Sequence, residues 1–70
     1  MQAEIHFKES GVALINDLTQ IIKSKPNSDT QKITDFNQFF LSKHANFTFV
    51  GKSETLTLRS DDILYVKFYS

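Results

Sequence analysis

Alternation of apolar and polar residues is clearest in the last third of the chain, residues 47–70. Three short runs place an apolar side chain at every second position, the period of strands with one buried face. The runs are Phe47 and Phe49, then Leu56 and Leu58, then Leu64, Val66 and Phe68. Polar segments, Gly51-Lys52-Ser53 and Ser60-Asp61-Asp62, separate the runs and are typical of turns. The pattern predicts three consecutive strands. Residues 3–7 alternate in the same way and predict one more.

Two segments between these strands have the spacing of amphipathic helices. After Ser10, a residue type favoured at helix N-caps, apolar residues recur at intervals of three and four. They are Leu14, Ile15, Leu18, Ile21 and Ile22. Pro26 is expected to end this helix. Beyond a polar connector at residues 27–29, Ile33, Phe36 and Phe40 predict a second helix over residues 30–43.

The predicted elements describe one α+β domain spanning residues 1–70. Their order is β-α-α-β-β-β, with both helices on one face of a four-stranded, largely antiparallel sheet. In the last strand, residues 63, 65, 67 and 69 are expected to point away from the core. The residues expected to face the core are Ile5, Phe7, Leu14, Leu18, Ile21, Ile22, Phe36, Phe40, Phe47, Phe49, Leu56, Leu58, Leu64, Val66 and Phe68.

Composition limits how such a domain is stabilised. A chain of 70 residues buries only about 60% of its unfolded surface, so its core is small. Without cysteine it has neither a disulfide nor a thiolate zinc site. Seven phenylalanines enlarge the core in part, and association with a partner would stabilise it further.

Charge and hydropathy favour a cytoplasmic protein without membrane contact. Eight basic side chains balance eight acidic ones, so the net charge attracts neither nucleic acid nor an anionic membrane. No apolar run approaches the roughly 20 residues of a membrane-spanning helix, and the N-terminus lacks the apolar core of a signal peptide. The absence of cysteine fits a reducing compartment.

The sequence shows no constellation of catalytic or metal-binding residues. His6 and His44 are isolated from each other and from carboxylate groups at ligand spacing. Asp61 and Asp62 are adjacent, so in an extended chain their carboxylates point to opposite faces. Neither a nucleophile triad nor a phosphate-binding glycine loop is suggested by spacing. We therefore expect no enzyme activity, no cofactor and no metal.

The outer face of the last strand is the strongest candidate for a binding surface. A domain of this size cannot cover both faces of its sheet, and tyrosine suits protein contacts. The candidate partner-binding residues are Val50, Ile63, Tyr65, Lys67 and Tyr69. A plainer explanation is that tyrosine favours strands in general. If the face binds a partner, we expect a homodimer or an obligate protein partner.

Residues 47–66 resemble the opening strands of LytTR-type DNA-binding domains of bacterial response regulators. The similarity rests on Phe49-Val50-Gly51-Lys52, Leu56-Thr57-Leu58 and Asp61-Asp62-Ile63-Leu64-Tyr65-Val66. That family continues with further strands and a helix, which this sequence does not reach. The resemblance implies a shortened relative and does not by itself carry DNA binding over.

Two functions from different classes remain open. The first is a non-enzymatic protein-interaction or regulatory module of bacterial or mobile-element type, in which an exposed sheet face or an unpaired strand edge accepts a partner. The alternative is a small nucleic-acid-binding, LytTR-like domain. Its phosphate contacts would come from Lys43, Lys52, Arg59 and Lys67. Balanced charge counts against the alternative, and whether these cations share one face discriminates between the two.

Overall fold

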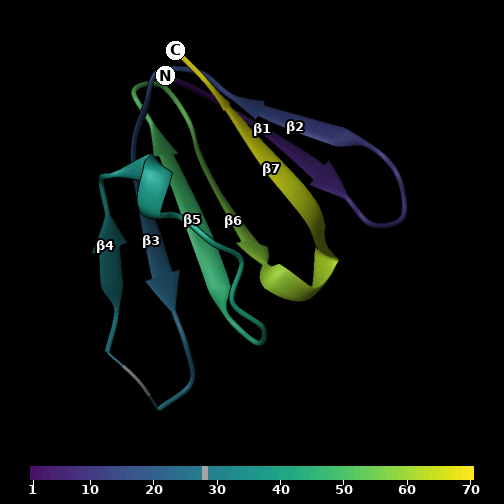
Figure 1. Ribbon diagram of the computed structural model, residues 1–70, viewed down its shortest axis with the longest axis vertical. Helices are drawn as coiled ribbons and strands as arrows, with labels where there is room; N and C mark the ends of the chain where they lie inside the picture. Colours follow the sequence, from purple (N-terminus) through teal and green to yellow (C-terminus); the bar gives the residue numbers. More distant parts are fainter. Residues whose placement is uncertain (28) are drawn as a thin grey trace.

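Two antiparallel sheets packed face to face form the domain in the computed structural model, which describes residues 1–27 and 29–70 (Figure 1). The first sheet has the strand order β2-β1-β7 and the second the order β4-β3-β5-β6. The strands are β1 (Gln2–Phe7), β2 (Val12–Ile15), β3 (Leu18–Ser24), β4 (Gln31–Ile33), β5 (Asn46–Gly51), β6 (Thr55–Arg59) and β7 (Ile63–Tyr69). Short 3-10 turns, η1 (Phe36–Gln38) and η2 (Ser60–Asp62), lie in two of the connections.

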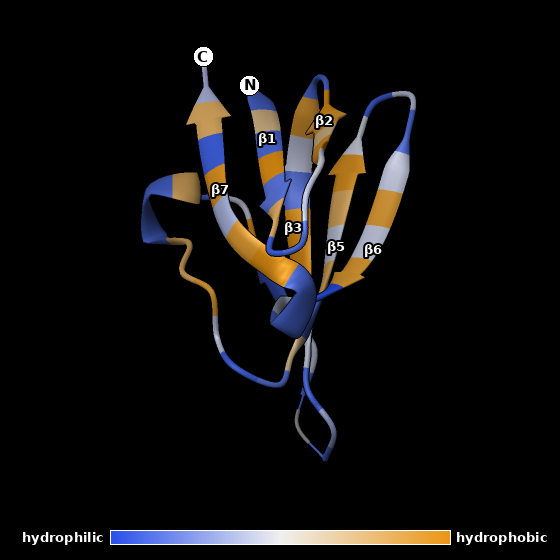
Figure 2. Ribbon diagram, turned by 90° about the vertical axis from the view of Figure 1, so that its right-hand side faces the viewer, coloured by the Kyte–Doolittle hydropathy of each residue, from blue (hydrophilic) through white to orange (hydrophobic). Residues whose placement is uncertain are grey.

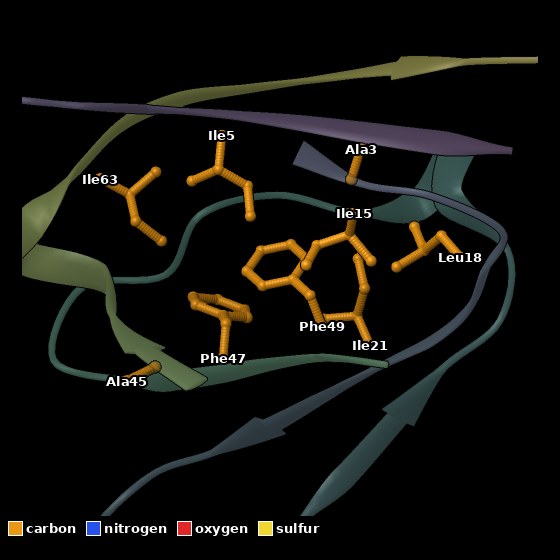
Figure 3. Close-up of a cluster of buried hydrophobic side chains, with 9 residues drawn as sticks. All are labelled: Ala3, Ile5, Ile15, Leu18, Ile21, Ala45, Phe47, Phe49 and Ile63. Carbon is orange, nitrogen blue, oxygen red and sulfur yellow. The ribbon is translucent and has the colours of Figure 1, made fainter. Parts of the chain in front are cut away.

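The core lies between the inner faces of the two sheets, where Figure 3 shows side chains of both sheets pointing toward one another. Alternation along the strands produces it: in Figure 2, hydrophobic and hydrophilic bands succeed one another along β1, and hydrophobic and near-neutral bands along β6. The buried apolar residues are Ala3, Ile5, Ile15, Leu18, Ile21, Ala45, Phe47, Phe49 and Ile63. The strands predicted at residues 3–7 and 47–70 are confirmed as β1, β5, β6 and β7.

The α+β class predicted from sequence is wrong, because the described residues contain no α-helix. The segment expected as the first helix forms β2 and β3, which belong to different sheets. Asp17 turns the chain between them with φ at 53°, a left-handed conformation that aspartate tolerates. A bulge then adds Thr19, since Leu18 lies opposite Gly51 and Gln20 opposite Val50.

This corner and this bulge reproduce helical spacing on strands. Ile15, Leu18 and Ile21 are three residues apart, yet all three are buried in the core. The corner and the extra residue each add one position to the two-residue alternation, so buried residues there lie three positions apart. The β-branched residues of this segment favour the strands.

The segment predicted as the second helix, residues 30–43, forms β4, η1 and an irregular connector instead. It crosses from β4 to β5, and its aromatic rings fill one side of the sandwich. The Phe39 ring centroid lies 5.3 Å from that of Phe47 and 5.4 Å from that of Phe68, on opposite sheets. These contacts outweigh a weak helix preference. Of the connector predicted at residues 27–29, Ser28 lies outside the described residues.

A second bulge changes which side chains face the core at the start of β7. Phe7 lies opposite Ile63 and His6 opposite Tyr65, so Leu64 is an extra residue on β7. Ile63 is therefore buried, whereas Leu64 is 56% exposed. The prediction that Leu64 faces the core and Ile63 the solvent is wrong. The same prediction fails for Leu14 and Phe40, which are 49% and 66% exposed.

Candidate functional site

The outer face of the β2-β1-β7 sheet carries the largest gathering of exposed apolar and aromatic side chains that the register defines. Alternation turns every second residue of these strands away from the core. We call this surface the outer face. Its residues are Gln2, Glu4 and His6 of β1, Val12 and Leu14 of β2, and Tyr65, Lys67 and Tyr69 of β7. Val12, Leu14, Tyr65 and Tyr69 are among the exposed large hydrophobic residues of the protein.

Side-chain contacts within and between β1 and β7 hold the centre of the outer face in place. The His6 and Tyr65 rings stack, with centroids 4.2 Å apart and planes 19° from parallel. The Nε2 atom of His6 donates a hydrogen bond to Oε1 of Glu4, and Nζ of Lys67 lies 5.8 Å from the Tyr65 ring centroid. Glu4 also lies directly opposite Lys67 in the register. The face is therefore an ordered, amphipathic surface.

The structure brings together three of the five residues predicted to bind a partner. Tyr65, Lys67 and Tyr69 share the outer face, since they alternate along β7 after the bulge. Ile63 is 2% exposed and belongs to the core. Val50 lies in β5 of the other sheet. These two therefore cannot join the three on one surface.

Sequence reasoning missed the contribution of β1 and β2 to this face. Val12 and Leu14 lie in the segment predicted as the first helix, although they alternate with Ala13 and Ile15 as in a strand. The alternation of residues 3–7 indicates an outward His6, but the sequence does not reveal Tyr65 as its partner, because pairing of β1 with β7 depends on residues far apart in the chain. The short alternation of residues 12–15 is the feature of the sequence that indicates a strand here.

The four cations considered for nucleic-acid contact do not share one face. Lys52 precedes β6 and Arg59 ends it, so they lie at opposite ends of one strand. Lys67 lies on the other sheet, and Lys43 lies in the connector before β5. Arg59 Nε is also 3.9 Å from Oδ2 of Asp62, which offsets part of its charge. A continuous basic surface is not formed by these residues.

Asp61 and Asp62 lie in η2, as the sequence predicted for a turn, and they border a cleft. This cleft of about 530 Å³ opens between η2 and the turn after β1. It is lined by Phe7, Lys8, Glu9, Ser10, Leu58, Asp61 and Asp62.

No group of three or more His, Asp or Glu side chains that could hold a metal ion is found in residues 1–27 and 29–70. His44 occupies a left-handed turn, φ 58°, before β5.

The fold and the outer face together define a small β-sandwich domain with one uncovered, aromatic sheet face. Comparison of the chain with protein-family models, with curated proteins and with solved structures finds no match. Among the described residues, no helix has the length and apolar character needed to cross a membrane.

Proposed function

We propose that this domain is a non-enzymatic protein-interaction module and that the outer face is its binding surface. The observation that carries the proposal is the grouping of Val12, Leu14, Tyr65 and Tyr69, all exposed, on one sheet face. Exposed groups of this kind mark interaction sites more often than isolated apolar residues do. Tyrosine is enriched in the energetically dominant parts of interfaces.

The ordered polar groups of the outer face support binding to a protein surface. Glu4, His6 and Lys67 supply an acceptor, a ring and a cation, and each already has a contact on the face: Glu4 with His6, His6 with Tyr65, and Lys67 with Tyr65. Because these groups are held in place before binding, little side-chain entropy remains to be lost on association. The mixed charge favours a partner of mixed charge over a polyanion.

The test compares capture by three forms of the protein from a lysate of the source cells. Tyr65→Asp places a charge at the centre of the outer face, whereas Thr55→Asp places the same charge on exposed β6 of the other sheet. We expect the same binding protein to be recovered with the unmodified protein and with Thr55→Asp, and to be lost with Tyr65→Asp. Circular dichroism establishes that both variants are folded. Recovery that is unaffected by Tyr65→Asp would refute the outer face as the binding surface.

A second candidate function is nucleic-acid binding, for which the observation is the resemblance of residues 47–66 to LytTR-type domains. The segments that carry this resemblance form the consecutive strands β5, β6 and β7. The separation of Lys43, Lys52, Arg59 and Lys67 counts against it, because affinity for nucleic acid depends on grouped phosphate contacts.

A further inference from the structure

We infer that the partner of the outer face is a second copy of this chain, packed against it about a twofold axis that runs across the strands. This inference rests on the proposed function, because it names the occupant of the same surface. It follows from the order in which residues of the three strands lie side by side on the outer face.

Two neighbouring rows of side chains cross the sheet. In the first row, called the Glu4 row, Leu14 and Lys67 lie on either side of Glu4. In the second, called the His6 row, Val12 and Tyr65 lie on either side of His6. Each row therefore runs from an aliphatic residue on β2, through a polar residue on β1, to a long side chain on β7.

The chemistry of the two rows is complementary, position by position. A twofold axis between the rows, perpendicular to the strands, places the Glu4 row of one copy on the His6 row of the other. Leu14 then meets an aliphatic residue, the Glu4 carboxylate meets an imidazole, and the Lys67 ammonium meets a phenol ring. The last two contacts are ones that the chain already makes within itself, between Glu4 and His6 and between Lys67 and Tyr65. Self-complementarity of this kind is what a twofold interface requires.

Other twofold arrangements of the same face are less favourable. An axis that runs along β1 stacks Glu4 on its own copy, and like charges placed opposite each other repel. An axis along the strands but between β1 and β7 leaves Val12 and Leu14 uncovered, although they are 52% and 49% exposed. Of the three, the axis across the strands covers the aliphatic residues and places no like charges opposite each other. The strands of the two copies are then nearly aligned, as in packed sheets generally.

The size of the face sets the strength of this dimer. Three strands span about 14 Å, and the length of β1 is about 20 Å. This footprint is well below the roughly 800 Å² of accessible surface that each partner buries in a stable complex. We therefore expect a weak dimer, with a dissociation constant on the order of 0.1–1 mM.

The first measurement is the weight-average mass of the purified protein by sedimentation equilibrium, from about 20 µM to about 2 mM. We expect it to rise from the monomer mass of 8.1 kDa toward twice that value. A mass that stays at 8.1 kDa over the whole range overturns the inference.

A pair of variants tests the register itself. Leu14→Asp and Val12→Lys each place a charge against an aliphatic residue of the second copy, so each alone should weaken association by about tenfold or more. When the two variants are mixed, the new carboxylate faces the new ammonium at one of the two equivalent contacts and the other contact stays apolar. We expect the mixture to recover the mass of the unmodified protein.

The control is a mixture of Leu14→Asp with Leu14→Lys, which carries the same charges on the same face. Association in that mixture should stay weak, because in the proposed register each new charge lies opposite Val12 of the other copy and not opposite the other new charge. Equal recovery in both mixtures would show attraction by net charge alone and would overturn the register. A protein that stays monomeric but loses its captured partner in Tyr65→Asp would refute self-association and leave the proposed function intact. If the protein stays monomeric and its captured partner is also unaffected by Tyr65→Asp, then self-association and the proposed function are both refuted.

Discussion

At the scale of single residues, Gly51 shows how a side chain can be excluded by the corner that joins the two sheets. Its amide donates a hydrogen bond to the carbonyl oxygen of Glu54, and that of Lys52 to the carbonyl oxygen of Asp17. The turn after β5 is thereby tied to the corner between β2 and β3. A Cβ atom on Gly51 would lie 2.6 Å from the carbonyl oxygen of Asn16 and 2.9 Å from Cγ2 of Ile15.

We therefore expect Gly51→Ala to destabilise the domain by about 2 kcal/mol, because backbone atoms at the corner must move to accept one methyl group. Ser53→Ala, in the same turn but exposed, should change the free energy of unfolding by less than about 0.5 kcal/mol. Urea unfolding followed by circular dichroism measures both. Equal stability of the two variants would show that the corner is not tightly packed.

Two buried serines lead to opposite expectations. The Ser60 hydroxyl accepts a hydrogen bond from the amide of Ala45, 3.1 Å away, so Ser60→Ala leaves a buried donor unpaired and should cost about 1–2 kcal/mol. Among the described residues, Ser42 Oγ has no hydrogen-bond partner although it is buried. Ser42→Ala should then be neutral or stabilising, since it removes a desolvated group. Thermal melts compare the two, and a clear loss of stability in Ser42→Ala contradicts this account.

At the scale of elements, the connector between β4 and β5 distinguishes two adjacent phenylalanines. Phe39 packs between the sheets, whereas Phe40 is exposed and has Nζ of Lys23 4.9 Å from its ring centroid. We expect Phe39→Ala to cost about 2–4 kcal/mol and Phe40→Ala less than about 1 kcal/mol. In the helix predicted from sequence, Phe40 would be the more costly of the two. Chemical denaturation of both variants measures the difference.

The strands themselves follow from local alternation, and the irregularities within them do not. In β5 and β6 a strict two-residue period places Phe47, Phe49 and Leu58 on the inner side, as predicted. In β3 and β7 one extra residue, Thr19 or Leu64, changes which side chains face inward. A bulge depends on the partner strand, so its position is not encoded in the alternation of the bulged strand alone.

At the scale of the whole molecule, the distribution of charge decides what a polyanion can contact. Lys52 and Arg59 are separated by the length of β6, and the net charge is zero. We expect binding to duplex DNA at physiological salt to be weak, with a dissociation constant above about 10 µM, and to weaken steeply as salt rises. The double change Lys52→Glu and Arg59→Glu should abolish what binding there is, while Lys25→Glu should change it little.

Fluorescence anisotropy of a labelled duplex, titrated at several salt concentrations, measures this prediction. Sub-micromolar and sequence-selective binding at physiological salt would contradict it and would favour the LytTR-like function over the protein-interaction module. Binding that survives the double change would show that its phosphate contacts come from other residues.

The sequence alone determined the strands at both ends of the chain, the turn at Ser60–Asp62 and the outward position of Tyr65, Lys67 and Tyr69. These features depend on a local period, which each strand carries in its own residues. Only the tertiary structure decided that residues 12–24 form strands of two sheets, that Ile63 is buried, and that β1 and β2 complete the outer face. The physical reason is that corners, bulges and strand pairing are selected by contacts between distant segments, which overrule helical spacing wherever the two conflict.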